Sequence, residues 1–164
     1  KERSNSLKKS IEDLQVRYKG LLVVNWPLIS EQEVGAIQAI EEQQILSEIL
    51  FHSDLMVSIY STLIIEACIC DLPIINVGFF SYRNTSLKNN IYERFTHIDK
   101  LKINNAMSTA NSEEELIKQI NLYMVDKTIL KEGRKKLTET ESGPNKGFAG
   151  AFIANEIFNI ANKV

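Results

Sequence analysis

Four hydroxyl side chains stand where an apolar run ends and a helix is expected to begin; they are Ser58, Tyr60, Ser61 and Thr62. The first turn of a helix has N–H groups without intrahelical acceptors and carries the positive end of the helix dipole, so it favours an anion. Ser61 and Thr62 could add hydroxyl donors to a diphosphate held there. Ser and Thr are also preferred N-caps, and the hydroxyl cluster taken alone favours simple capping.

Glu66 is the one acid in the segment Leu63–Ile69, whose other members are all apolar. A carboxylate buried among them would cost several kcal/mol unless it found hydrogen-bond donors. Thr62 and Glu66 are separated by four positions, so on a helix they share one face. We therefore predict that Thr62 meets phosphate and Glu66 accepts hydrogen bonds from two ribose hydroxyls. The alternative is a structural ion pair between Glu66 and an Arg or Lys of a later helix.

The pattern around these residues predicts strands that alternate with helices. Short apolar runs predict buried strands at 21–25, 55–59 and 73–77, with a weaker fourth at 106–109. Apolar residues at helical spacing predict helices at 6–18, 41–51, 61–70, 112–125, 127–139 and 148–162. This alternation is typical of an α/β fold, here a Rossmann-like three-layer domain with a parallel sheet. Ligands of such sheets bind beyond the carboxyl ends of the strands, which is where the hydroxyl cluster falls.

Composition limits the function classes. The 164 residues suffice for one domain, taken as residues 1–164, and the formal net charge of −2 gives no reason to expect nucleic acid. No apolar run approaches the ~20 residues that span a bilayer, and no signal peptide is visible, so a cytoplasmic protein is expected. Cys68 and Cys70 are interpreted as small core residues of a reducing compartment, without a metal ligand set. The abrupt start, without Met, suggests a fragment of a longer two-domain chain.

The run Asp54–Asn76 resembles the C-terminal, donor-binding half of GT-B glycosyltransferases. The residues that carry the resemblance are Ser61-Thr62 before the helix of Glu66, and Asp71-Leu72-Pro73 before the next strand. Downstream segments are similar to the same family's tail: Phe95-Thr96-His97, residues 106–116, and residues 143–149 with the helix that follows. The resemblance extends from Trp26 to the C-terminus. It includes bacterial surface-polysaccharide glycosyltransferases and CDP-glycerol glycerophosphotransferases, and more distantly the UDP-N-acetylglucosamine 2-epimerase group.

The resemblance implies a metal-independent transferase half that binds a nucleotide sugar or CDP-glycerol as substrate and needs no cofactor. It implies the following donor-binding residues: Ser61 and Thr62 for the diphosphate, Tyr60 beside them, Glu66 for the ribose, and Asn25 and Trp26 for the nucleobase. Arg83, in a long polar loop at 78–90, could neutralise the departing diphosphate, and the alternative is a solvated surface. His97 is implied as the catalytic candidate, in contact with the donor phosphate or the acceptor, and the alternative is a capping or core histidine.

The acceptor site and general base of this family come mostly from an N-terminal domain, which is not found here. The isolated chain is therefore expected to bind donor weakly and to turn over little. The full-length protein would act in bacterial surface glycan or glycolipid synthesis, at the inner face of the membrane if it associates peripherally. Two rivals stay open: a sugar-nucleotide epimerase of related fold, and a non-enzymatic Rossmann-like interaction module.

Overall fold

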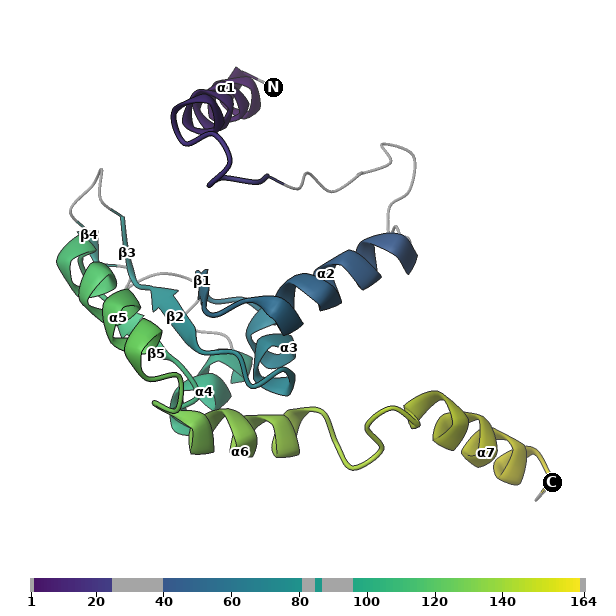
Figure 1. Cartoon of the computed structure of the whole chain (residues 1–164). Helices are drawn as coiled ribbons and strands as arrows, with labels where there is room; N and C mark the ends of the chain where they lie inside the picture. The colour runs from purple at the N-terminus through teal and green to yellow at the C-terminus, as the bar shows by residue number, and fades with distance from the viewer. Residues whose placement is uncertain (1, 25–39, 81–84, 87–95, 163–164) are drawn as a thin grey trace. The chain divides into compact units, whose positions relative to one another are not determined.

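The computed structural model describes residues 2–24, 40–80, 85–86 and 96–162 of the chain (Figure 1). They belong to two compact units, Lys1–Gln43 and Gln44–Val164. All the elements that position the candidate site belong to the second unit. Within the described ranges, no helix combines the length and the apolar character needed to cross a membrane.

The first unit contains the helix α1 (Glu2–Arg17), which confirms the helix expected at 6–18. The strand expected at 21–25 is wrong over residues 21–24, which have no strand structure, and residue 25 lies outside the described residues. Leu21 and Val23 are 85% and 88% exposed. A short apolar run becomes a strand only where a neighbouring strand pairs with it, and the described part of this unit offers none.

Three parallel strands form the centre of the second unit. They are β1 (Met56–Ser58), β2 (Ile74–Val77) and β5 (Ser108–Ala110), in the order β1-β2-β5. Their positions confirm the strands expected at 55–59, 73–77 and 106–109. A separate antiparallel pair, β3 (Phe79–Phe80) and β4 (Thr85–Ser86), follows β2. The α/β class and the parallel sheet are thus confirmed.

Helices cover both faces of the sheet, as Figure 1 shows for α3 (Leu63–Ile69) and α5 (Glu113–Val125) on either side of β2. Successive residues of a strand point to opposite faces. Ile74 therefore joins the larger apolar cluster with α3, α4 (Thr96–Ile103) and α6 (Lys131–Glu141), while Ile75 packs with Tyr123 of α5. The larger cluster also receives Leu50 of α2 (Ile40–His52).

Local sequence signals define several helix ends. Ser112 caps α5, because its hydroxyl accepts a hydrogen bond from the Glu115 N–H at 3.2 Å, which confirms the capping box expected there. The Glu115 carboxylate reaches back and accepts from the Asn111 N–H at 2.7 Å. The last helix, α7 (Ala149–Ala161), follows the turn expected around Gly143 and Gly147, both of which have positive φ.

Arg134 of α6 anchors the connection between α3 and β2. Its side chain is 1% exposed, and its Nε donates to the Asp71 carboxylate at 3.0 Å. Nη1 and Nη2 donate to the carbonyls of Ile129 and Lys127 at 2.7 and 2.8 Å. Lys131 makes a second ion pair with Asp71 at 3.0 Å. One guanidinium thus links the Asp71 side chain, 63 positions away along the chain, to two carbonyls of the segment just before α6.

The ion pairs of Asp71 with Lys131 and Arg134 make the stability of the fold depend on pH. Burial acts to raise the pKa of the Asp71 carboxyl, but hydrogen bonds from Lys131 and Arg134, with their charges, outweigh it and leave the pKa below the ordinary 3.8. A carboxyl group whose pKa is lower in the folded state than in the unfolded state stabilises the fold. This contribution is complete above the unfolded-state pKa and is lost as the pH falls through the folded-state pKa.

We therefore expect the substitution Asp71→Asn to lower the free energy of unfolding by about 1 kcal/mol at pH 7, a modest loss because solvent screens a side chain that is 46% exposed. Asn tolerates the left-handed backbone of this position, where φ is 52°. Urea melts from pH 7 to pH 2 should show the difference from wild type shrinking below about pH 4, where free Asp becomes protonated. A difference that stays constant down to pH 2 would contradict this role of Asp71.

Candidate functional site

The carboxyl ends of the three parallel strands carry a row of polar side chains. Strand register pairs Ser58 with Asn76 and Asn76 with Thr109. Residues paired side by side in parallel strands point to the same face, and Asn76 shares its face with Ile74, which packs beneath α3. The apolar face beneath α3 therefore ends in three polar residues at the edge where ligands of such sheets bind.

Asn76 is the most unusual member of this row, since it is 0% exposed in the middle strand. Neither its amide oxygen nor its amide nitrogen has a hydrogen-bond partner among the described residues, whereas buried polar groups normally have one. Ser58 does not supply it, because the Ser58 hydroxyl donates to the Ile59 carbonyl at 2.8 Å. The sequence reasoning missed Asn76, although a lone amide in the apolar run 73–77 was a signal that could have found it.

Gly78 allows β2 and β5 to stay close just beyond this row. Its N–H donates to the Ala110 carbonyl at 2.8 Å. A Cβ added at Gly78 would lie 2.9 Å from the Thr109 methyl group and 3.1 Å from the same carbonyl. The absence of a side chain at Gly78 thus helps to define the edge of the sheet.

Ser61 and Thr62, the two residues predicted to bind phosphate, make different hydrogen bonds in the turn from β1 to α3. Ser61 is used in capping, because its hydroxyl accepts from the Leu63 N–H at 3.2 Å and its carbonyl accepts from the Ile64 N–H. Thr62 is the N-cap by position, yet its side chain makes no cap hydrogen bond. The Ile65 N–H bonds to the Thr62 carbonyl, so local oxygens already satisfy the first N–H groups of α3. Thr62 therefore presents the free hydroxyl of this turn.

Glu66 is exposed, so the expectation that it is buried among apolar neighbours is wrong. The reason is that α3 has only seven residues and buries one stripe, formed by Ile64, Ala67 and Cys68. Thr62 and Glu66 lie together on the opposite, exposed side, as their i, i+4 spacing predicted. No described Lys or Arg forms an ion pair with Glu66, so the structural alternative has no support within those ranges.

The remaining predicted residues are spread along the chain. Tyr60 is half-buried against the larger core cluster, and Lys102 Nζ lies 5.3 Å from the centre of its ring. Asn25, Trp26 and Arg83 lie outside the described residues, and their predicted roles stay predictions. His97 falls in the first turn of α4, with its side chain outside the described part.

Both cysteines are free and lie in or against the larger core cluster. Cys68 is 3% exposed, which confirms it as a core residue, and Cys70 is partly buried against the same cluster. Across the described ranges, no group of three or more His, Cys, Asp or Glu side chains could hold a metal ion.

Comparison of the chain with protein-family models, with curated proteins and with solved structures gave no match. The resemblance to GT-B transferases therefore stays a prediction from the sequence. The structure shows the α/β arrangement, with Thr62 at the start of α3 after the carboxyl end of β1 and Glu66 one turn further along that helix.

Proposed function

We propose that this chain is the nucleotide-donor-binding half of a metal-independent GT-B glycosyltransferase of bacterial surface glycan or glycolipid synthesis. The observation that carries the proposal is that Thr62 and Glu66 share one face of α3. Both lie on the exposed side of α3, and neither side chain has a partner among the described residues. Thr62 also stands at the start of α3, just after the carboxyl end of β1, which is the edge where an α/β sheet binds its ligand, and Glu66 follows one helical turn later.

The two side chains suit two parts of one ligand. Residues four positions apart on a helix have Cβ atoms about 5–6 Å apart, which is the scale of the step from a diphosphate to its ribose. The Thr62 hydroxyl donates to a phosphate oxygen, and the Glu66 carboxylate accepts from the ribose hydroxyls. A carboxylate repels phosphate, so this order of contacts is the one that charge allows.

In the transfer step, an acceptor oxygen forms a bond to the anomeric carbon, while the bond from that carbon to the diphosphate breaks. The diphosphate leaves with the electron pair of that bond, and the acceptor proton goes to a base of the acceptor domain. The Thr62 hydroxyl hydrogen bonds to the departing diphosphate. Fixed donors of this kind stabilise developing charge without a metal ion.

Calorimetric titration of the chain with UDP, with CDP and with GDP tests the proposal. We expect one of the three nucleotides to bind most tightly. Thr62→Val and Glu66→Gln should each weaken the complex with that nucleotide about five- to tenfold. Each lost hydrogen bond is worth on the order of 1 kcal/mol, and more where the partner is charged. Glu132→Gln, an exposed acid of α6, is the matched control and should leave affinity unchanged. If neither Thr62→Val nor Glu66→Gln changes affinity, the site assignment fails.

The second candidate function is a protein-interaction module, and the exposed apolar surface of α7 is the observation that favours it. All thirteen residues of this helix are exposed, including Phe152, Ile157 and Phe158. Exposed apolar surface of this kind is typical of a protein contact. A chain that binds none of the three nucleotides would support the module over the transferase half.

A further inference from the structure

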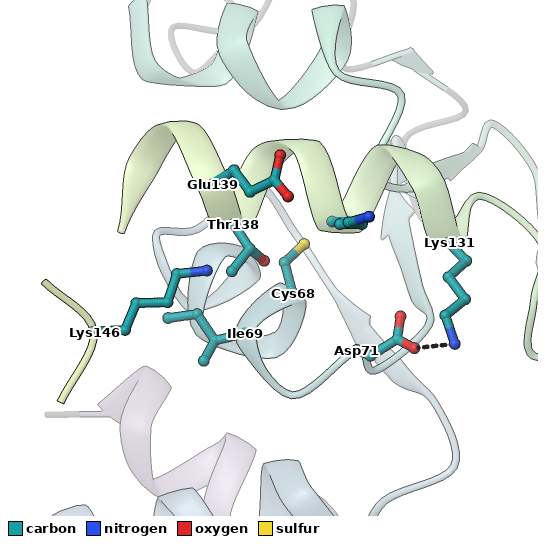
Figure 2. Close-up of a pocket in the computed structure, with 8 residues that line it drawn as sticks. Cys68, Ile69, Asp71, Lys131, Thr138, Glu139 and Lys146 are labelled. Atoms are coloured by element: carbon teal, nitrogen blue, oxygen red, sulfur yellow. Dashed lines mark ion pairs between the residues drawn. The ribbon is translucent and has the colours of Figure 1, made fainter. Parts of the chain in front are cut away.

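A cavity of about 340 Å³ opens between the end of α3 and the outer side of α6 (Figure 2). Its lining residues are Cys68, Ile69, Asp71, Lys131, Lys135, Thr138, Glu139 and Lys146. Because α3 leaves the carboxyl end of β1 and leads to the start of β2, its last residues lie at the amino edge of the sheet. The cavity therefore lies at the opposite end of α3 from Thr62.

The cavity gathers positive charge in a chain whose formal net charge is −2. Lys131, Lys135 and Lys146 all line it, and the Asp71 charge is already neutralised by Lys131 and the buried Arg134. Neither Lys135 nor Lys146 forms an ion pair with any residue that the structure describes. Two ammonium groups and one carboxylate, that of Glu139, thus line the cavity without an ion pair among the described residues, which leaves an excess of positive charge for an anion.

The spacing of Lys131, Lys135 and Glu139 along α6 explains why all three line the cavity. Residues 131, 135 and 139 follow one another at i, i+4 spacing and so share one face of the helix. Like charges at this spacing repel, and Lys131 is already paired with Asp71, so Lys135 is the lysine of this row that gains from a bound anion. Lys146 approaches from the segment after α6, and Figure 2 shows its ammonium group directed toward Thr138.

The floor of the cavity is small and uncharged. Cys68 and Thr138 are 3% and 8% exposed, and the Thr138 hydroxyl donates to the Arg134 carbonyl at 2.9 Å. Burial raises the pKa of the Cys68 thiol to about 12, partly opposed by the Arg134 charge, so the thiol stays neutral. Glu139 supplies the one carboxylate of the rim without an ion pair in the described ranges, and such a group accepts hydrogen bonds from hydroxyls.

We propose that this cavity binds a small phosphorylated polyol. The ammonium groups of Lys135 and Lys146 bind its phosphate, and the Glu139 carboxylate accepts from its hydroxyls. The volume is at the lower end of the range for small-molecule sites, about 300–1,000 Å³, which suits a ligand of a few carbons. This site is independent of the proposed nucleotide site at the carboxyl edge.

Calorimetric titration of the full chain with glycerol 3-phosphate and with inorganic phosphate, at one fixed ionic strength, tests the proposal. We expect glycerol 3-phosphate to bind more tightly than phosphate. Lys135→Gln and Lys146→Gln should each weaken both complexes about fivefold or more. Glu139→Gln should weaken the polyol complex and leave the phosphate complex equal or tighter, since it removes a negative charge.

Lys136→Gln is the matched control, because Lys136 is an exposed lysine of the same helix that does not line the cavity. It should leave both affinities unchanged, and so should Thr62→Val at the other edge of the sheet. Equal losses from Lys136→Gln and Lys135→Gln would overturn the proposal in favour of general charge attraction. No binding of either probe at millimolar concentration would overturn it as well. Circular dichroism melts identify any variant that fails to fold, and Lys135→Arg, which keeps the charge, should then retain binding.

Discussion

The substitution Gly133→Ala is expected to lower the free energy of unfolding by about 3 kcal/mol or more. A Cβ at this position of α6 would lie 2.0 Å from the Asn105 carbonyl oxygen and 2.5 Å from its carbonyl carbon. It would also lie 2.6 Å from the Asn104 carbonyl oxygen. Overpacking typically costs about 1–3 kcal/mol, and here backbone rather than a flexible side chain must move. The higher helix propensity of Ala returns about 1 kcal/mol at most.

Urea denaturation of Gly133→Ala measures this loss directly. Gly150→Ala is the matched control, because Gly150 also lies in a helix and a Cβ there would have no neighbour within 4 Å. The control should leave stability equal or slightly higher. If Gly133→Ala were as stable as the wild type, α6 would not pack against the turn that follows α4.

The substitution Arg134→Met is expected to cost about 3 kcal/mol or more. It removes three hydrogen bonds from a side chain that is 1% exposed and leaves the carbonyls of Ile129 and Lys127 without that donor. An unsatisfied buried polar group costs about 1–3 kcal/mol, and breaking a buried ion pair costs about 3–5 kcal/mol. The loss here should lie toward the lower figures, because Asp71 keeps Lys131 and is partly exposed.

Thermal and urea denaturation together measure the effect of Arg134→Met. Lys136→Met, at an exposed position of the same helix, should change stability by less than about 0.5 kcal/mol. Arg134→Lys should recover little, because an ammonium group cannot reach three separate acceptors in the planar geometry of a guanidinium. An Arg134→Met protein within 1 kcal/mol of wild type would show that the guanidinium network has no role in holding the connection at Asp71.

Local patterns predicted much of the second unit. The runs 55–59 and 73–77 became neighbouring parallel strands, and Ser112 capped α5 as the capping box indicated. These predictions succeeded because the signals lie within a few residues of the structure they specify. The run 21–25 carried a similar apolar signal, yet 21–24 have no strand partner in the described part of their unit. Pairing depends on chain that is distant in sequence, which a local pattern cannot show.

In the candidate site, too, local features could be predicted from the sequence and features that depend on distant residues could not. The i, i+4 spacing of Thr62 and Glu66 fixed their shared side, while burial of Glu66 was wrong because α3 buries a single stripe. Asn76 was missed because its lack of a partner depends on its neighbours in the folded sheet. Arg134 and Gly133 were missed for the same reason, since their contacts at Asp71 and Asn105 lie far along the chain.

The most direct measurement is a map of amide chemical-shift changes when the best-binding nucleoside diphosphate is added to the isotope-labelled chain. The proposed nucleotide site predicts the largest changes at residues 58–66, together with Gly78 and Asn111 at the ends of β2 and β5. Changes confined to residues 68–71 and 131–146 would place the nucleotide at the opposite edge of the sheet. Either that pattern or an unchanged spectrum would contradict donor binding at Thr62 and Glu66.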